Sequence, residues 1–230
     1  MPATQLVFLH GFGEDERVWE DFLPYHTFSF PVICPAYAEW TDCATLADYA
    51  HKIVSSLPSD SHFILVGHSM GGYIALEIAS QFPERVQKVV MLHSTFVADS
   101  EEKKINRDRT ADLLEKKGTG FFIGPFLPNL FASASSDLLA TLAERYRNLP
   151  AAGLIAATKA MRDRKDFTSF VQQTAIPFLF ILGEKDALIS PESITRFVKK
   201  SVVILPNVGH QGTYESPKAV AEAINQFVNV

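Results

Sequence analysis

The sequence predicts an α/β fold with three layers, in which helices cover both faces of a mostly parallel β-sheet. Uncharged apolar runs such as Leu6–Leu9, Phe63–Val66 and Phe178–Leu182 are typical of strands buried on both faces of a parallel sheet. Stretches whose apolar residues repeat at helical spacing separate these runs. At 230 residues, 47% of them hydrophobic, the chain is long enough to bury one substantial core.

The first part of the chain is expected to form two strands and two helices. Leu6–Leu9 is short and wholly apolar, and Phe28–Cys34 is the next segment with strand character. Between them, Glu14–Tyr25 has apolar residues at helical spacing, and we interpret its Trp19 as a core residue and not as a substrate contact. Thr45–Leu57 shows the same spacing and predicts the next helix.

The remainder of the chain is expected to add further strands and a long helical segment. Phe63–Val66 and three later apolar runs bring the expected sheet to about six strands. Residues 97–174 lack any strand pattern, and glycines and prolines divide them into helical stretches. The later strands are Val86–Leu92, Phe178–Gly183 and Val202–Leu205, and the helical stretches are Glu101–Lys117, Gly120–Phe131, Asp137–Leu149 and Leu154–Asp163.

Composition and charge exclude several classes of partner. A net charge of −5 and an isoelectric point near 5.8 give no basic surface for nucleic acid or an anionic membrane. We interpret the charged runs Glu101–Arg109 and Arg162–Lys165 as solvated. Cys34 and Cys43 show neither a metal-ligand spacing nor a disulfide framework. Because Leu6–Leu9 is too short for a signal peptide or a membrane span, we expect a cytoplasmic protein; its oligomeric state is not specified.

The chain is organised around a strand, a sharp turn and a helix. The strand Phe63–Val66 stops at Gly67, and residues 67–71, Gly-His-Ser-Met-Gly, match the pattern Gly-x-Ser-x-Gly. A serine on so tight a turn is held in a strained backbone conformation, and glycines avoid clashes between the strand and the helix. The turn is expected to expose the Ser69 hydroxyl above the sheet, at the positive end of the following helix.

Three further signals accompany this turn. His-Gly-Phe-Gly at residues 10–13 follows the first strand, Gly-Glu-Lys-Asp at residues 183–186 follows an apolar strand, and Gly-His stands at residues 209–210. With the serine turn, these segments resemble the α/β-hydrolase superfamily over nearly the whole chain. The chain has only about five residues before its first strand, where larger members place a hairpin, and it lacks their glycine-rich turn after the second strand.

The resemblance implies a catalytic triad. Ser69 matches the nucleophile, Asp186 the acid and His210 the base, in the order typical of this superfamily; Glu184 is the alternative acid. In this chemistry the base takes the proton from the serine and later gives it to the leaving group, while the acid orients the imidazole and stabilises its charged form.

The resemblance also implies an oxyanion hole and its neighbours. The backbone N–H groups of Phe12 and Met70 match its two donors, which meet the negative oxygen of a tetrahedral intermediate. His93 and Ser94, at the carboxyl end of a strand, are expected to line the pocket or form hydrogen bonds there. His68 is expected to pack in the turn or at the pocket edge and not to take part in the chemistry.

The long helical segment resembles the lid of this superfamily. On that basis, residues 97–174 form the lid, and residues 1–96 with 175–230 form the α/β-hydrolase core. An apolar stretch within the lid is expected to form a hydrophobic wall for an acyl or aryl group, with lid-to-core packing as the alternative. The residues of this wall are Phe121, Phe122 and Phe126.

The serine nucleophile selects among the activities of this superfamily. Dehalogenases and epoxide hydrolases resemble the chain in layout, but their nucleophile is an aspartate at the position of Ser69. We therefore expect a serine hydrolase that cleaves a small, apolar acyl compound such as an ester through an acyl-enzyme, without cofactor or metal. C–C bond hydrolases, acyltransferases and perhydrolases share the triad and remain alternatives, as does a ligand receptor with a vestigial triad. Vitamin-K-pathway lyases are disfavoured, because they place arginine where this chain has Tyr73 and carry extra basic pocket residues.

Overall fold

The computed structural model describes residues 3–27, 29–198 and 201–229. Within these residues six strands form one sheet in the order β2-β1-β3-β4-β5-β6, and each neighbouring pair is parallel. This arrangement confirms the predicted α/β fold. The strands are β1 (Thr4–Leu9), β2 (Val32–Ile33), β3 (His62–His68), β4 (Val86–Leu92), β5 (Phe178–Gly183) and β6 (Val202–Leu205).

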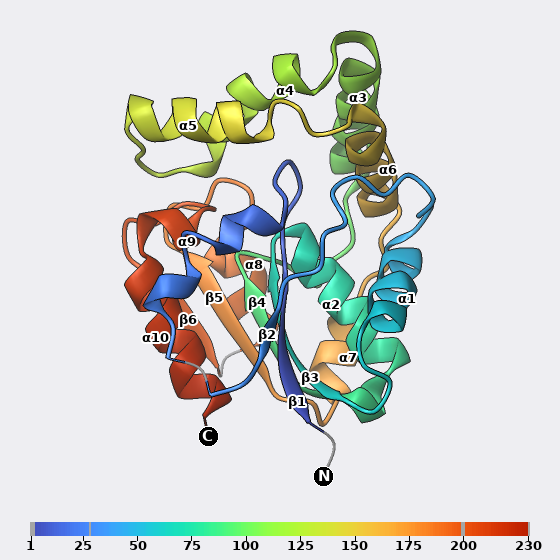
Figure 1. Ribbon diagram of the computed structural model, residues 1–230, viewed down its shortest axis with the longest axis vertical. Coiled ribbons are helices and arrows are strands. Elements are labelled where there is room, and N and C mark those ends of the chain that lie inside the picture. Colours follow the sequence, from blue (N-terminus) through green and yellow to red (C-terminus); the bar gives the residue numbers. More distant parts are fainter. Residues whose placement is uncertain (1–2, 28, 199–200, 230) are drawn as a thin grey trace.

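Helices cover both faces of the sheet, which explains why its strands are apolar throughout. In β1 the alternating residues Leu6 and Phe8 join one buried cluster, while Val7 and Leu9 join another on the opposite face. One face is covered by α1 (Leu46–Ser56), α2 (Met70–Gln81), α7 (Thr168–Gln173) and α8 (Pro191–Thr195). The other is covered by η1 (Glu16–Trp19), η2 (Leu23–Tyr25) and α10 (Pro217–Val228) (Figure 1).

Two predicted elements near the N-terminus are shorter than expected. The segment 14–25 forms the two 3₁₀ turns η1 and η2 instead of one helix, although Trp19 is a core residue as predicted. The predicted strand Phe28–Cys34 is reduced to Val32–Ile33, and its Phe28 lies outside the described residues. Pro31 and Pro35 flank this edge strand. Because proline lacks an N–H group, neither can donate a hydrogen bond to a neighbouring strand, although the carbonyl oxygen of Pro31 accepts from Leu6 N at 2.9 Å.

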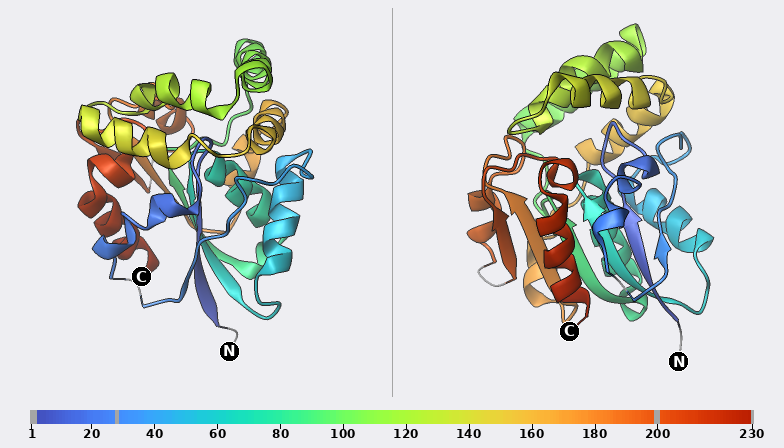
Figure 2. Two further views of the ribbon diagram at one scale, coloured as in Figure 1. Left: turned by 45° about the horizontal axis from the view of Figure 1, so that its top comes forward. Right: turned by 60° about the vertical axis from the view of Figure 1, so that its left-hand side comes forward.

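A helical segment lies over the carboxyl edge of the sheet (Figures 1 and 2). Its helices have a buried cluster of their own, which includes Leu114, Phe122 and Tyr146. The segment differs from α7, whose Phe170 packs against Phe178 of β5. The division into a core and a lid at residues 97 and 174 stays a prediction. The helices are α3 (Glu101–Lys117), α4 (Thr119–Phe126), η4 (Leu127–Leu130), α5 (Ser136–Tyr146) and α6 (Ala151–Arg162).

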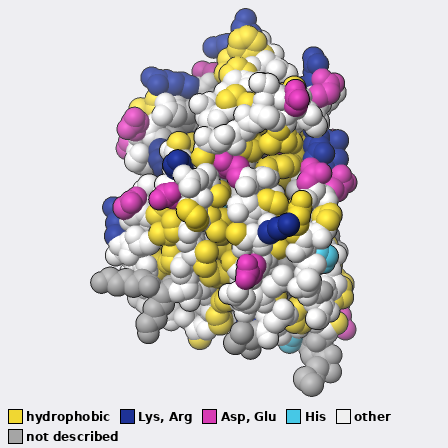
Figure 3. Space-filling view, turned by 90° about the vertical axis from the view of Figure 1, so that its left-hand side faces the viewer, with side chains coloured by type: hydrophobic (Ala, Val, Ile, Leu, Met, Phe, Trp, Pro, Cys, Tyr) yellow, Lys and Arg dark blue, Asp and Glu magenta, His cyan; other side chains and the backbone are white. Residues whose placement is uncertain are grey.

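Two short elements complete the fold. η3 (Pro83–Arg85) leads into β4, and α9 (Gly212–Glu215) precedes α10. On the face shown in Figure 3, acidic and basic side chains are interspersed with hydrophobic ones. Among the described residues, none of the helices combines the length and the apolar character that crossing a membrane requires.

Candidate active site

Ser69 occupies a strained turn between β3 and α2. Its φ of 52° and ψ of −115° lie outside the regions that a serine ordinarily adopts. The turn is tight because strand and helix approach closely: a Cβ on Gly67 would lie 2.4 Å from Gly71 O, and one on Gly71 would lie 2.1 Å from Leu9 O. Both positions therefore require glycine, as the Gly-x-Ser-x-Gly pattern predicts.

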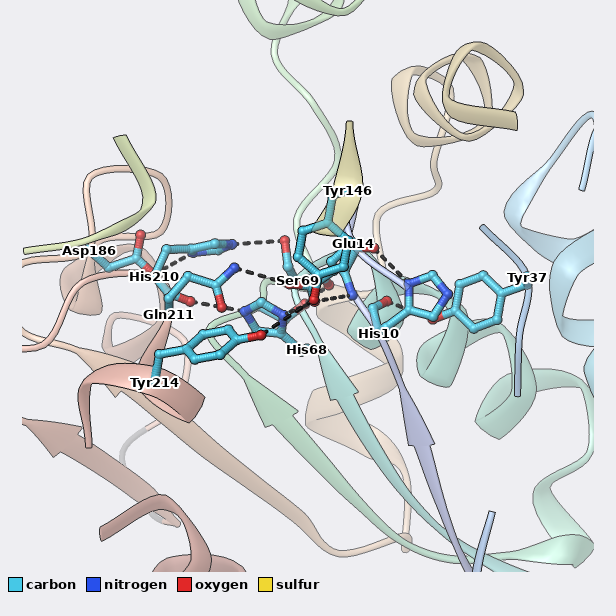
Figure 4. A network of polar contacts seen from close by, with 12 residues as sticks. His10, Glu14, Tyr37, His68, Ser69, Tyr146, Asp186, His210, Gln211 and Tyr214 are labelled. Carbon is cyan, nitrogen blue, oxygen red and sulfur yellow. Dashed lines mark hydrogen bonds and ion pairs between the residues drawn. The ribbon is translucent and has the colours of Figure 1, made fainter. Parts of the chain in front are cut away.

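The structure brings the three predicted triad residues into one hydrogen-bonded chain (Figure 4). The Ser69 hydroxyl lies 2.8 Å from His210 Nε2, and His210 Nδ1 lies 2.7 Å from Asp186 Oδ2. Asp186 follows β5 and His210 follows β6, so the parallel sheet delivers both to the edge where β3 ends. If Nδ1 carries its proton toward the carboxylate, Nε2 is free to accept one from the serine, which is what a serine nucleophile requires.

The carboxylate of Asp186 is fully buried and held in its ionised form. Burial alone would raise its pKa, but the nearby His210 and the hydrogen bonds it accepts hold the pKa well below the ordinary value. Its Oδ1 accepts from the backbone N–H groups of Leu188 and Ile189 at 2.8 and 3.0 Å. Asp186 is therefore a fixed negative charge behind the imidazole. Glu184, the alternative acid, instead accepts from the backbone of Asn207.

The loop that carries His210 is anchored by neighbouring segments. The His210 backbone N–H donates to Leu130 O at 2.7 Å, which joins the loop to η4. Glu215 binds both sides of this junction, since Oε2 accepts from Gly209 N at 2.9 Å and Oε1 accepts from Ala132 N at 2.8 Å. The helical segment over the carboxyl edge of the sheet, inserted between β4 and β5, thus helps to position the histidine.

The predicted oxyanion donors lie beside the serine. Phe12 lines the same cavity as Ser69, and Met70 is the first residue of α2. Neither backbone N–H donates to another group among the described residues, so both are available to a ligand oxygen. The loop before Phe12 is held by Glu14, whose Oε1 accepts from Gly11 N at 2.6 Å.

Glu14 and His68 form a buried pair that the sequence analysis missed. His68 Nδ1 lies 2.6 Å from Glu14 Oε1, and its Nε2 lies 2.9 Å from the carbonyl oxygen of His210. Both ring nitrogens face acceptors, so the charged imidazolium satisfies both (Figure 4). Burial opposes both charges, yet Glu14 raises the pKa of His68, and His68 lowers the pKa of Glu14 to about 2. Gln211 also donates to Glu14 at 3.1 Å.

His93 and Ser94 lie behind the site. His93 is fully buried, does not line the cavity, and has its Nδ1 3.7 Å from Asp186 Oδ2. Burial lowers the pKa of His93 to about 4, so it is neutral near pH 7. The Ser94 hydroxyl donates to the backbone carbonyl of Ser69 at 2.7 Å. Both residues therefore support the site from beneath, and neither contacts the cavity.

A cavity of about 220 Å³, partly open to solvent, lies above Ser69 and His210. Phe122 and Phe126 line it, and their rings pack with that of Phe12 at centroid distances of 5.8 and 5.9 Å. Phe121, predicted with them, is 58% exposed and is not among the lining residues. The hydrophobic wall is thus formed by one face of α4, and Phe121 is on another.

A model of the "Alpha/beta hydrolase family" matches residues 6–223 of the chain. The chain belongs to this family. It is therefore an enzyme of the α/β-hydrolase type, in agreement with the fold and with the esterases among its relatives.

Relatives and structural neighbours of this hydrolase have several functions. It is 26% identical to a 2-succinyl-6-hydroxy-2,4-cyclohexadiene-1-carboxylate synthase from Enterobacter sp. (strain 638), covering 98% of this chain and 92% of that one. It is 27% identical to a pimeloyl-[acyl-carrier protein] methyl ester esterase from Nitrosomonas europaea, covering 90% and 89%. A thermophilic esterase from Thermogutta terrifontis, solved with malate bound, superposes with a TM-score of 0.88 at 24% identity, covering 99% and 90%.

The cavity of this hydrolase also contains charged residues that the sequence analysis placed in solvent. Lys103 and Arg107, from the run Glu101–Arg109, and Arg164, from the run Arg162–Lys165, all line it. Arg164 is buried because its guanidinium pairs with Asp99 at 2.7 Å. The residues of Glu101–Arg109 are nonetheless exposed or half-buried, as interpreted, whereas the interpretation of Arg162–Lys165 as solvated is wrong at Arg164. Because basic residues do line the cavity, one of the two reasons for disfavouring vitamin-K-pathway lyases no longer holds.

Among the described residues, no group of three or more histidine, cysteine, aspartate or glutamate side chains is arranged to hold a metal ion. Cys34 and Cys43 are both free thiols, and burial raises the pKa of each, to about 12 and about 11.

Proposed function

We propose that this α/β hydrolase cleaves a small carboxylic ester through an acyl-enzyme formed on Ser69. The observation that carries the proposal is the chain of hydrogen bonds from Ser69 Oγ through His210 to Asp186, which opens into a cavity beside two unpaired backbone N–H groups. The groups proposed as nucleophile, base, orienting acid and oxyanion donors thus lie in one site, which supports the proposal.

The proposed reaction has two halves. Ser69 Oγ attacks the ester carbonyl as its proton passes to His210 Nε2, and the N–H groups of Phe12 and Met70 stabilise the resulting oxyanion. The C–O bond to the alcohol then breaks, and His210 returns the proton to the departing oxygen. A water molecule, deprotonated by His210, attacks the acyl-enzyme and releases the acid, and the proton returns to Ser69. Asp186 stays ionised throughout.

The shape of the cavity supports an acyl group with an apolar part. Phe122 and Phe126 offer aromatic surface next to the proposed oxyanion hole, and their rings lie 4.9 Å apart. Ester hydrolysis is also the activity named for the Nitrosomonas europaea relative. A small-molecule ester, and neither a nucleic acid nor a membrane, is the proposed partner.

A second candidate function is favoured by one specific observation. Lys103, Arg107 and Arg164 place cationic groups on one wall of the cavity, and a synthase is among the relatives. A lyase-type reaction of an anionic substrate is therefore the alternative to ester hydrolysis. C–C bond hydrolysis, acyl transfer and a receptor role would use the same Ser69, His210 and Asp186, and we rank them after the lyase-type reaction.

The proposal predicts that Ser69→Ala abolishes turnover of p-nitrophenyl esters. We expect the variant to lose at least about a thousandfold in kcat, because within the described part of the chain Ser69 is the hydroxyl bound to His210. The measurement is release of p-nitrophenol from esters with acyl chains from acetate to dodecanoate. The acyl chain that is cleaved best indicates how long a group the cavity accommodates. Release of more than one equivalent per protein separates an enzyme from a receptor that reacts once.

Equal activity of wild type and Ser69→Ala would reject Ser69 as the nucleophile. If neither protein cleaves any of these esters, simple esterase activity is rejected, and the lyase-type and C–C bond reactions become the next to be assayed.

A further inference from the structure

One helix presents its polar side, and not an apolar side, to the cavity. The residues of α3 that line the cavity are Lys103, Asn106, Arg107 and Thr110, which follow one another at intervals of three, one and three. This spacing forms a single stripe along a helix. A helix packed on a protein ordinarily turns its apolar stripe inward, and here only Ala111 and Leu114 of α3 are buried apolar residues. Lys103 and Asn106 are exposed and Arg107 and Thr110 are half-buried, so this side of the cavity is polar and partly solvated, and it suits a ligand with a polar end.

Positive charge on this wall exceeds the negative charge available to neutralise it. Asp99 is fully buried and pairs with both arginines, at 2.7 Å from Arg164 NH1 and 3.1 Å from Arg107 Nε. Among the described residues, Lys103 has no carboxylate within ion-pair distance. Three cations therefore face one carboxylate. Partial desolvation and the two neighbouring arginines lower the pKa of Lys103, although Asp99 opposes this change.

Another part of the cavity lining is apolar. Phe122, Phe126 and Leu130 belong to this part. The other buried carboxylates of the site are Asp186 and Glu14, which are committed to His210 and His68. The whole chain has a net charge of −5, so the positive wall is a local feature and not a consequence of composition. A ligand that fits both walls has an apolar stem and an anionic group.

We propose that the substrate is a half-ester of a dicarboxylic acid, with Lys103 and Arg107 binding its free carboxylate. The methylene stem lies along Phe122 and Phe126, and the ester carbonyl lies at Ser69. Lys103 and Arg107 thus determine specificity and take no part in the covalent chemistry. This assignment rests on the proposed ester hydrolysis and names its substrate class.

A pair of isosteric esters tests the assignment in the wild-type protein. Monomethyl adipate carries a terminal carboxylate, and methyl 6-methylheptanoate replaces that carboxylate with an isopropyl group of similar shape. We expect kcat/KM for methanol release to favour the anionic ester by roughly tenfold at low ionic strength, and the preference to narrow as salt is added. Equal or greater activity on the neutral ester would overturn the assignment.

Substitutions in α3 test whether the preference for the anionic ester arises from Lys103 and Arg107. In Lys103→Met and Arg107→Gln we expect the ratio of the two kcat/KM values to fall by roughly three- to tenfold each. Lys116→Met is the matched control, because Lys116 is exposed on the same helix and does not line the cavity; its ratio should equal that of the wild type. A ratio unchanged in both cavity variants, or reduced equally in the control, contradicts the assignment.

A binding measurement separates this assignment from the proposed reaction. If the wild type cleaves neither ester, the proposed hydrolysis fails, but monomethyl adipate can still be titrated calorimetrically into Ser69→Ala. Binding that weakens severalfold in Ser69→Ala/Lys103→Met, and not in Ser69→Ala/Lys116→Met, supports the anionic site independently of turnover. Absent or equal binding in all three proteins overturns it.

Discussion

At the scale of single residues, Glu14 connects the loops that carry the proposed catalytic groups. Its Oε1 accepts from Gly11 N, next to the proposed donor Phe12, and from His68, next to Ser69. His68 in turn donates to the carbonyl of His210. One buried ion pair therefore connects the oxyanion loop, the serine turn and the histidine loop. Each of these loops contributes an atom whose position the proposed reaction requires.

The first residue-scale prediction concerns Glu14→Gln, which keeps the shape of the side chain and removes its charge. We expect kcat to fall roughly 10- to 100-fold while KM changes less, because the N–H of Phe12 and the imidazole of His210 lose their fixed positions. Steady-state kinetics on p-nitrophenyl butyrate, with thermal unfolding of the same samples, make the measurement.

Glu20→Gln is the control, because Glu20 is an exposed glutamate at the end of η1. A Glu14→Gln variant that melts earlier but keeps its kcat would show that Glu14 stabilises the fold without positioning the site.

At the scale of elements, the structure decides which face of each inserted helix meets the cavity. α3 begins and ends at the predicted residues, Glu101 and Lys117, with Ser100 as its N-cap. Its sequence is polar nearly all round, so periodicity does not indicate an inward face. In α4 the opposite holds, since apolar residues occur on several sides and only Phe122 and Phe126 of the predicted phenylalanines line the cavity.

The different positions of Phe126 and Phe121 on α4 predict unequal effects when each is replaced. We expect Phe126→Ala to lower kcat/KM for p-nitrophenyl hexanoate by roughly tenfold, because the acyl chain loses apolar contact area. Phe121→Ala, on the exposed side of the same helix, should leave kcat/KM nearly unchanged. Losses of similar size in both variants would mean that Phe121 turns toward the substrate when it binds.

At the scale of the whole molecule, a buried ion-pair cluster ties the inserted helices to the sheet. Asp99 lies between β4 and α3, Arg107 lies on α3, and Arg164 follows α6. Arg164 also donates to Val97 O at 3.1 Å, and its guanidinium lies 4.4 Å from the centre of the Tyr73 ring in α2. The cluster therefore joins the entry and the exit of the inserted segment to the helix that follows Ser69.

Removing the central carboxylate should weaken the whole fold. Asp99→Asn leaves the buried guanidinium of Arg164 without a counter-charge, and we expect the free energy of unfolding to fall by about 3–5 kcal/mol. Urea unfolding of wild type and variant measures this difference. Asp108→Asn is the control, because Asp108 pairs with Arg162 on the surface and its loss should cost far less. Similar midpoints for Asp99→Asn and wild type would contradict the prediction.

The strands and the proposed catalytic residues were predictable because local signals encode them. Apolar runs indicate buried parallel strands, and in a parallel sheet the residues after the strands meet at one edge. Ser69, Asp186 and His210 each follow such a strand, so their contact follows from the order of the elements. The edge strand Val32–Ile33 is shorter than its apolar character predicts, because the prolines on either side cannot donate hydrogen bonds to a neighbouring strand.

The sequence by itself thus determined the fold, the serine turn and the edge of the sheet where chemistry takes place. Only the tertiary structure decided the character of the cavity. Glu14 pairs with His68, which lies 54 positions later in the chain. Asp99 pairs with the buried Arg164, which belongs to the charged run Arg162–Lys165. Such pairs leave no periodic or local signal, because a buried charge is stabilised by whichever opposite charge the packing of distant segments places against it.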